Sequence, residues 1–540
     1  MKDASFPSHY FHLDGLLLVN PDGRHPIYDL VERAESAWNA KLHRASTTYK
    51  QLVFEYRRRY KRAPPPGFDK WWEYVKKHNV QLPDEYDQIY ADLQPFWGIT
   101  PTDLQKIQRE WEGRYDTYTL GKAEGEPLHI VTDKLPDDPV KCKGLLMGGY
   151  ETIRLLEDVQ HLLPPFRAVF SPHDSASIFI NHAAKSLALK AAASGKALEM
   201  KKLPRSHRRG WVTACSAGSP AFTKELHTPK DAKSFIYDHR AAMDPCRHPS
   251  LLREHGQFIA HGVGPFGTQT IAPLFSYSSS AIHSDIHVTP TYSWVEDIYP
   301  REIDPEFENK VDNRLLWRGG NTGILHDHTK EWWLSQRDRL VEWANELSGT
   351  AIVLPARLSA FEKIGVGDKV NKADINPAMF DIAFAGHPSF CGGGDCKELV
   401  ERYDWRAPQS IANAGKYKYV FDVDGNGWSS RFKRLMTSNS LIFKASVYPE
   451  WFTDRIEPWV HYIPVKYDYT DVHDSLTFFR GDLSGRGSHL DMASKIAKAG
   501  REWSKTFWRK EDMVAYMFRL FLEYARVMRE DRDSITDIEM

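Results

Sequence analysis

The stretch that decides the fold is KYKYVFDVDGNGWSSRFKRLMTSNSLIFK, residues 416–444. Aromatic and β-branched residues recur at alternate positions through 417–423, which predicts a β-strand. Gly425-Asn426-Gly427 follows as a flexible turn. The next residues predict a helix that begins at Arg431, so the stretch is expected to be a strand, a glycine turn and a helix.

The end of this turn carries the residue types of a phosphate site. Ser429 or Ser430 can cap the helix, and Arg431 places a planar, permanently charged group at its start. Free backbone N–H groups and the positive end of a helix dipole attract anions at such a position. An ordinary strand–turn–helix connection with a serine cap is the structural alternative.

Two other interpretations of the same stretch are weaker. Gly425-x-Gly427-x-x-Ser430 resembles a dinucleotide fingerprint but lacks its third glycine. Asp422-Val423-Asp424 is an acidic triplet of the kind that holds a divalent metal with a sugar nucleotide. A turn-starting role for Asp424 is favoured over metal binding.

A second glycine-rich turn lies in RLLWRGGNTG, residues 314–323. An apolar strand at 315–317 would deliver Arg318, Asn321 and Thr322 to a strand end, where they could contact a diphosphate or a ribose. A plain turn with a solvent-facing arginine is the alternative. Taken with Arg431, the stretch predicts a two-arginine clamp on a diphosphate.

Short apolar runs and helical segments alternate from residue 128 onward, which predicts an α/β fold with a mostly parallel sheet. In such sheets ligands bind beyond the carboxyl ends of the strands. FSPHD at 170–174 puts His173 and Asp174 on a loop after one strand, although a lone aspartate there is usually a cap or turn residue. The expected strands are 128–133, 166–174, 351–358 and 380–386, with a helix at 177–194.

The two ends of the chain look helical. Residues 28–125 combine charge with spaced aromatics, and Pro64–Gly67 breaks this region into two helical parts. The pattern indicates an arm packed on a larger body, and a stem or spacer is the alternative that we favour. Apolar residues at spacings of three and four between Met513 and Met528 predict a packing helix that closes the fold.

Composition limits the function classes. The chain has 540 residues, which predicts two or three domains, and its 41% hydrophobic content excludes a disordered or fibrous protein. The net charge of −1 does not favour coating of nucleic acid or anionic membrane. No apolar run is long enough to cross a membrane, so we expect a soluble chain, either cytosolic or a lumenal domain trimmed of its anchor.

Two further clusters resemble metal sites. His283, Asp285 and His287 alternate, so they would share one face of a strand. His387, Cys391 and Cys396 make an incomplete zinc set, for which a local disulfide across the glycine loop is at least an equal alternative. We favour no metal at either cluster. The five cysteines leave at least one thiol unpaired within the chain.

These motifs together resemble the family 90 glycosyltransferases, which include fungal capsule-associated xylosyltransferases and Rumi-type protein O-glucosyltransferases. The resemblance covers residues 165–530 and fits the fungal branch better, notably in DGNGWSSRFK. The stretches that carry it are FSPHD, IYDHRAAMDPCRHP (236–249), HSDIHVTP, LLWRGGNTG, DVDGNGWSSRFKRLMTSNSLIFK, EPWVHYIPV (457–465) and IAKAGREW (496–503).

The resemblance implies a GT-B fold of two Rossmann-like lobes that face each other across a cleft. The expected parts are a helical N-terminal extension (1–127), a first lobe on the acceptor side with the catalytic base (128–310), a second lobe that binds the UDP-sugar (311–495) and C-terminal helices that pack back on the first lobe (496–540).

The resemblance also implies an inverting transfer from a UDP-sugar. It matches Asp174 to the catalytic base and Arg318 and Arg431 to the arginines beside the phosphates. The residues expected to bind the donor are Arg318, Asn321, Thr322, Asp424, Gly425, Asn426, Gly427, Ser429, Ser430 and Arg431. If the arginines stabilise the leaving UDP, no cofactor is required, and manganese is possible but not favoured.

The expected reaction moves xylose from UDP-xylose to a mannose-containing glycan through a β-linkage, in the lumen of the Golgi or secretory pathway. Transfer of glucose from UDP-glucose to a protein serine is the alternative, and a nicotinamide-dependent oxidoreductase or a glycan-binding protein without turnover are more distant ones. The expected partners are the UDP-sugar and a glycan acceptor, with no nucleic acid, and with a membrane only through an anchor absent from this chain.

Overall fold

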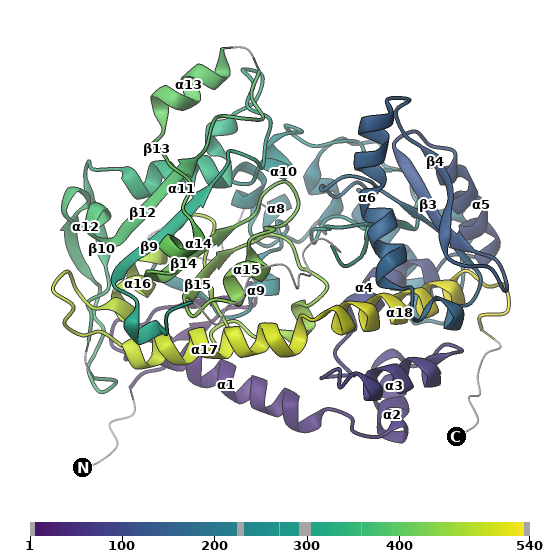
Figure 1. The fold of residues 1–540 in the computed structure, drawn as a ribbon, viewed down its shortest axis with the longest axis horizontal. Helices are drawn as coiled ribbons and strands as arrows, with labels where there is room; N and C mark the ends of the chain where they lie inside the picture. Colours follow the sequence, from purple (N-terminus) through teal and green to yellow (C-terminus); the bar gives the residue numbers. More distant parts are fainter. Residues whose placement is uncertain are drawn as a thin grey trace.

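Two β-sheets lie side by side and form the frame of the molecule (Figure 1). The computed structural model describes residues 6–223, 232–268, 270–290, 304–357, 359–392 and 394–533. Within these ranges the chain is a mixed α/β protein, as the alternating apolar runs predict.

The larger sheet has six strands, all parallel, in the order β13-β12-β9-β14-β15-β16. Counted along the chain this order is 3-2-1-4-5-6, in which the direction of winding reverses between β9 and β14. The strands are β9 (Asp312–Gly319), β12 (Phe380–Ala385), β13 (Trp405–Arg406), β14 (Tyr417–Val423), β15 (Leu441–Ala445) and β16 (Ile463–Pro464). The crevice beyond the carboxyl ends of β9 and β14 is therefore the expected ligand site of this sheet.

The smaller sheet is mixed, in contrast to the Rossmann-like first lobe that the family resemblance implies for residues 128–310. Its order is β4-β3-β5-β7-β8, and only β5, β7 and β8 are parallel to one another. The strands are β3 (Thr117–Lys122), β4 (His129–Lys134), β5 (Phe166–Phe170), β7 (Leu274–Ser276) and β8 (Ile286–His287). Because β3 pairs with both β4 and β5, the expected boundary after residue 127 cuts through this sheet.

Helices from both ends of the chain cover the sheets. The N-terminal helices are α1 (Pro26–Arg44), α2 (Tyr49–Tyr60), α3 (Phe68–Lys77), α4 (Asp87–Trp97) and α5 (Pro101–Glu112). The chain reverses between α2 and α3 at Gly67, whose φ of 84° suits glycine. α17 (Leu490–Phe507) packs on β15, and α18 (Lys510–Val527) packs on α3 and α4. The N-terminal region thus shares a core with the smaller sheet instead of standing apart as a stem.

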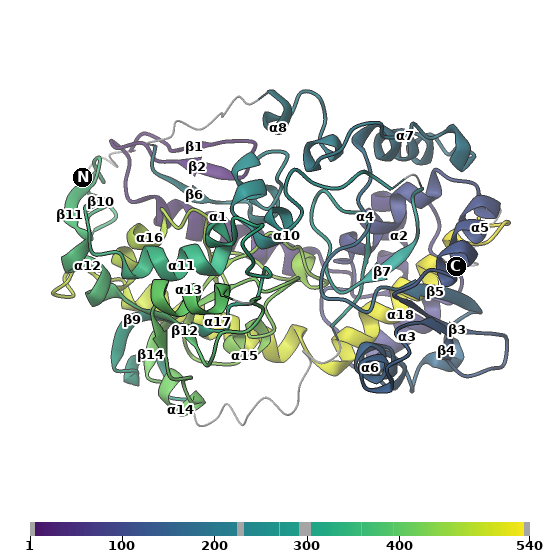
Figure 2. The same cartoon turned by 90° about the horizontal axis from the view of Figure 1, so that it is seen from above.

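The remaining elements connect or flank these layers (Figure 2). β1 (Tyr10–Phe11), β2 (Leu16–Leu18) and β6 (Ser234–Ile236) form a small antiparallel sheet, and β10 (Thr350–Val353) pairs only with β11 (Asp368–Asn371). The other helices are α6 (Pro139–Leu155), α7 (His182–Ala193), α8 (Pro220–Thr223), α9 (His239–Ala242), α10 (Gly256–Ile259), α11 (Gln336–Asn345), α12 (Lys372–Met379), α13 (Asp395–Arg402), α14 (Ile411–Ala414), α15 (Phe432–Met436) and α16 (Val472–Arg480).

Most expected elements are present at their expected places. β4, β5, β12 and β14 confirm the predicted strands, and α7 and α18 confirm the predicted helices. The strand predicted at 351–358 is shorter than expected: β10 ends at Val353 and belongs to neither large sheet, and Leu358 lies outside the described residues. No helix in the described part of the chain is long and apolar enough to cross a membrane.

Two disulfides are present in the described structure. Cys391 pairs with Cys396, so the alternative of a local disulfide is correct and the zinc set is not formed. Cys215 pairs with Cys246, and Cys142 is the unpaired thiol.

Phe521 anchors α18 to the smaller sheet. Its ring is fully buried and stacks on Phe166 of β5 at 4.5 Å between centroids. We expect Phe521→Ala to lower the free energy of unfolding by about 3–5 kcal/mol, because it removes a buried ring and leaves a cavity. Phe54→Ala, at a ring that is 69% exposed, should stay within about 0.5 kcal/mol. Urea denaturation measures both variants, and an equal loss of unfolding free energy in the two would contradict this role of Phe521.

Candidate functional site

Arg431 spans the point where the winding of the larger sheet reverses. Its Nη1 donates to the carbonyl oxygen of Arg318 at the end of β9 at 3.1 Å, and its Nη2 donates to that of Val423 at the end of β14 at 3.0 Å. The guanidinium is therefore fixed between the carboxyl ends of the two strands, where a parallel sheet of this order binds its ligand.

Arg337 makes a second bridge of the same kind, to residues just beyond the ends of the two strands. It comes from the first turn of α11, and it donates to the carbonyl oxygens of Gly320 at 2.8 Å and Asp424 at 2.9 Å. It also donates to the hydroxyl of Thr322 at 2.6 Å. Sequence reasoning missed this residue, although a helix that begins after a glycine-rich strand end is a signal that could have found it.

The two guanidinium groups lie close together in a buried setting. Both are packed over the ring of Trp317, with Arg431 at 5.1 Å and Arg337 at 5.8 Å from its centroid. Burial, with the charge of Arg431, lowers the pKa of Arg337 to about 9, and burial also lowers the pKa of Arg431. Burial and the neighbouring like charge both disfavour the charged form of these side chains. An anion bound between them would therefore stabilise that form.

Arg318 points away from this pair. Its guanidinium contacts the carboxylate of Asp381 on β12 at 2.5 Å, and the same carboxylate accepts from the Tyr417 hydroxyl and from Arg406. The expected clamp of Arg318 and Arg431 is therefore not formed in this structure. The side chain beside Arg431 is that of Arg337, because Arg318 lies along the sheet face and is held by its neighbouring strand.

A cavity of about 250 Å³ opens next to these arginines on the face of the larger sheet. Trp317, Arg318 and Arg431 form part of its wall, and the others include Pro408 and Gln409 from the loop after β13. Its walls combine apolar surface with a few polar groups, which is typical of a small-molecule site.

Asn321 and Thr322 are held by protein groups. The Asn321 side-chain oxygen accepts from the backbone N–H of Ser389 at 2.9 Å, and its amide donates to the Ser389 carbonyl, so it ties this loop to the segment after β12. Thr322 accepts from Arg337, as described above. Of the two, only Thr322 touches a residue of the arginine pair.

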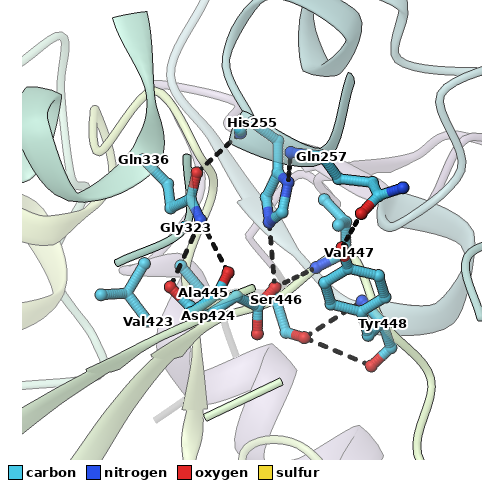
Figure 3. Close-up of polar contacts among 12 residues, drawn as sticks. His255, Gln257, Gly323, Gln336, Val423, Asp424, Ala445, Ser446, Val447 and Tyr448 are labelled. Atoms are coloured by element: carbon cyan, nitrogen blue, oxygen red, sulfur yellow. Dashed lines mark hydrogen bonds and ion pairs between the residues drawn. The ribbon is translucent and has the colours of Figure 1, made fainter. Parts of the chain in front are cut away.

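The acidic triplet faces inward. Asp424 is fully buried and accepts from the Tyr467 hydroxyl at 2.6 Å. It also accepts from the backbone N–H of Val447 at 2.9 Å, and His255 Nε2 lies 3.5 Å from it (Figure 3). Burial would raise its pKa, but the contacts with His255 hold the pKa of Asp424 below its usual value. These partners come from distant segments and enclose the carboxylate, and the assignment of Asp424 to the donor site stays a prediction.

Asp422 has separate partners. It accepts from the Ser429 hydroxyl at 2.5 Å and from the Lys444 ammonium at 3.0 Å. The described residues hold no group of three or more His, Cys, Asp or Glu side chains that could bind a metal ion.

The glycine turn adopts a different ending from the one predicted. α15 begins at Phe432, its N-cap residue is Arg431, and no side chain caps it. Ser429 is instead bonded to Asp422, and Ser430 is exposed. The predicted serine cap is wrong, and a helix of five residues contributes little dipole, so the charge of this site comes mainly from the arginines.

Asp174 meets the glycine turn across the gap between the two sheets. It lies on the exposed loop after β5, and Asn426 donates to its Oδ2 at 3.4 Å. The side-chain oxygen of Asn426 accepts from the backbone N–H of Gly323, so this one side chain links the loops after β5, β9 and β14. No local pattern in the sequence relates these loops, because Asp174 and Asn426 are 252 residues apart in the chain.

Gly427 makes the approach of the two loops possible. A Cβ at this position would lie 1.9 Å from the carbonyl oxygen of Asp174 and 2.7 Å from the hydroxyl of Ser278. Ser278 itself donates to that carbonyl at 2.6 Å. Only glycine fits between the strand ends of the two sheets at this point.

The cluster of His283, Asp285 and His287 does not converge. Asp285 accepts from the Ser276 hydroxyl at 2.7 Å, His287 contacts Asp92 at 2.9 Å, and His283 contacts the Ser280 hydroxyl at 2.7 Å. Each side chain is thus occupied by a different protein partner.

Gly427→Ala tests the contact between the loops. We expect it to lower the free energy of unfolding by about 1–3 kcal/mol, because the new methyl group has no room beside Asp174. Gly320→Ala is the matched control, since a Cβ there meets nothing within 4 Å. Urea denaturation of both variants measures the difference, and an equal effect would show that the two loops separate freely.

Comparison with known proteins agrees with the motifs. Residues 397–538 match the sequence model of Glycosyl transferase family 90. Protein O-glucosyltransferase 2 of Danio rerio is 27% identical over 266 residues, which are 48% of this chain and 44% of that protein. Protein O-glucosyltransferase 1 of Rattus norvegicus is 36% identical over 114 residues, 21% of this chain and 27% of that protein.

A third relative is O-glucosyltransferase rumi of Drosophila pseudoobscura pseudoobscura, 31% identical over 150 residues, 24% of this chain and 35% of that protein. The matches span less than half the length of each of these relatives. The resemblance to the family 90 glycosyltransferases, and to their Rumi-type members, is thereby confirmed.

Proposed function

We propose that this chain is an inverting glycosyltransferase that moves a sugar from a UDP-sugar to an acceptor hydroxyl. The observation that carries the proposal is the pair formed by Arg337 and Arg431 at the reversal point of the larger sheet, with Asp174 across from it at Asn426. We further propose that the two sheets are the lobes of a GT-B fold, because their strand ends meet at this contact.

The diphosphate of the donor would lie between Arg337 and Arg431. Planar guanidinium groups bind phosphate oxygens with two parallel hydrogen bonds, and both groups are already fixed by backbone carbonyls. Arg318 would have to open its ion pair with Asp381 to take part. The cavity beside Trp317 would then receive the nucleoside, with Gln409 among its polar groups.

The chemistry needs one base and one set of cations. As the acceptor hydroxyl attacks the anomeric carbon, Asp174 would take its proton, and the bond from that carbon to UDP would break on the opposite face. UDP gains negative charge as it leaves, and the two arginines would stabilise that charge in the transition state. Attack from the face opposite UDP inverts the configuration, so an α-linked donor gives a β-linkage.

Two donor–acceptor pairs fit this site. The motif resemblance to the fungal branch supports UDP-xylose with a mannose-containing glycan. The names of the relatives support UDP-glucose with a protein acceptor. A panel of UDP-sugars against both acceptor classes, with NMR of the product linkage, decides between them.

A lumenal location fits the covalent structure. Disulfides persist in oxidising compartments, and Cys215–Cys246 and Cys391–Cys396 are paired in this chain. We therefore place the protein in the lumen of the secretory pathway, with the Golgi as the expected compartment.

Asp174→Asn tests the base. We expect kcat for sugar transfer to fall by about 10²- to 10⁴-fold, because the amide cannot accept the proton. The UDP dissociation constant should stay within about twofold, since the arginines are untouched. Asp133→Asn, at an exposed carboxylate on β4, is the control and should leave kcat unchanged. An unchanged kcat in Asp174→Asn would remove this residue from the role of base.

Chelation tests the source of positive charge. We expect EDTA to leave most of the transfer activity intact, because Arg337 and Arg431 supply the charge that a metal would otherwise provide. Activity that EDTA abolishes and manganese restores would contradict this expectation. It would favour the alternative in which Asp422 binds a metal ion.

A further inference from the structure

A second cavity, of about 420 Å³, lies at the carboxyl end of β15. α1, the segment 237–243 that contains α9, and the loop 448–462 form its walls. α1 and α9 lie near the middle of the molecule, below the larger sheet in Figure 1. β15 is the neighbour of β14 in the sheet, so this cavity lies one strand along from the arginine pair.

Direct contacts connect this cavity to the glycine turn. The hydroxyl of Tyr448, which lines the cavity, donates to the carbonyl oxygen of Asn426 at 3.3 Å. The hydroxyl of Ser175, next to Asp174, donates to the same oxygen at 3.4 Å. Lys444 lines the cavity and bonds Asp422 of β14 at 3.0 Å. A molecule that fills the cavity would thus reach the neighbourhood of Asp174.

The charges of the cavity cancel. Its lining contains five basic residues and five acidic ones, namely Arg33, Lys41, Arg44, Arg240, Lys444 and Glu85, Asp238, Glu450, Asp454, Glu457. Four ion pairs join them: Arg240 with Asp454 at 3.1 Å, Lys41 with Glu457 at 3.3 Å, Arg44 with Glu85 at 3.6 Å and Lys444 with Glu450 at 3.6 Å. Such a lining favours neither an anion nor a cation.

Aromatic and polar groups alternate around the same space. Tyr237, Tyr448 and Phe452 offer ring surface, which packs well against the C–H faces of sugar rings. His239 is 95% buried, and its Nδ1 contacts the Tyr462 hydroxyl at 2.9 Å. Its buried Nε2 has no hydrogen-bond partner among the described residues, so a hydroxyl of a ligand would satisfy it.

We propose that this cavity binds a neutral oligosaccharide, the glycan part of the acceptor. The proposal rests on the proposed function. Sugar hydroxyls both donate and accept hydrogen bonds, so they match a lining of paired carboxylates, ammonium and guanidinium groups without leaving a net charge. The UDP-sugar itself carries a diphosphate and belongs at the arginine pair instead.

Ala37→Trp tests the proposal. Ala37 lines the cavity from an exposed position on α1, so the indole would fill the space without disturbing a core. We expect at least a tenfold weaker binding of mannotriose, measured by saturation-transfer NMR titration, and at least a tenfold higher KM for mannotriose as acceptor. The dissociation constant of UDP should not change.

Asn39→Trp is the matched control. Asn39 is exposed on the same helix, two residues on and therefore about 200° around its axis, and mannotriose binding should be unchanged there. Unchanged mannotriose binding in Ala37→Trp would overturn the proposal. The proposal would also be overturned if Ala37→Trp raised the KM for a serine peptide acceptor and not the KM for mannotriose. That result would indicate that the cavity binds a protein acceptor.

The measurement of mannotriose binding tests this proposal separately from the proposed function. Mannotriose binding that is lost in Ala37→Trp, in a protein that transfers no sugar from any UDP-sugar, would support the cavity and contradict the transferase. Transfer to mannotriose that proceeds equally in Ala37→Trp and wild type would support the transferase and contradict the cavity.

Discussion

The arrangement of the candidate site depends on the close contact between Gly427 and the carbonyl oxygen of Asp174. No side chain fits there, so the loop after β14 can lie directly on the loop after β5. Asn426 then reaches the Asp174 carboxylate and the backbone of Gly323 from one position. Because Gly427 has no Cβ, the loops that follow three strands of two different sheets can meet at one place. A base on one sheet can face a diphosphate on the other only if this contact is made.

The second requirement is electrostatic. A sheet of order 3-2-1-4-5-6 leaves carbonyl groups at the ends of β9 and β14 without strand partners, and Arg337 and Arg431 occupy them. These bonds orient both guanidinium groups before any ligand arrives. Because the two like charges are buried side by side, the free protein holds them at a cost that an anion would remove. The proposed diphosphate site thus combines a guanidinium group from α11 and one from the residue before α15 with backbone at the ends of β9 and β14.

The sequence predicted the local features well and the long-range ones poorly. The alternation in 417–423 and the glycine turn after it specify β14 and its loop, because both depend on neighbouring residues alone. The position of Asp174 came from family resemblance, since nothing local connects it to Asn426. Arg337 was missed because an arginine in a helix is usually a surface residue. Asp424 was assigned to the donor because it adjoins the turn, whereas Tyr467, Val447 and His255 enclose it from segments that no local pattern relates to it.

The most direct measurement is a crystal structure of the protein with UDP bound. We expect the diphosphate oxygens to lie within hydrogen-bond distance of both Arg337 and Arg431, and the uracil to occupy the cavity beside Trp317. The side of the diphosphate that the two arginines do not cover should face Asp174. A diphosphate bound elsewhere would contradict this, and so would one held on the face of the sheet by Arg318 while Arg337 keeps only its bonds to the Gly320 and Asp424 carbonyl groups and the Thr322 hydroxyl.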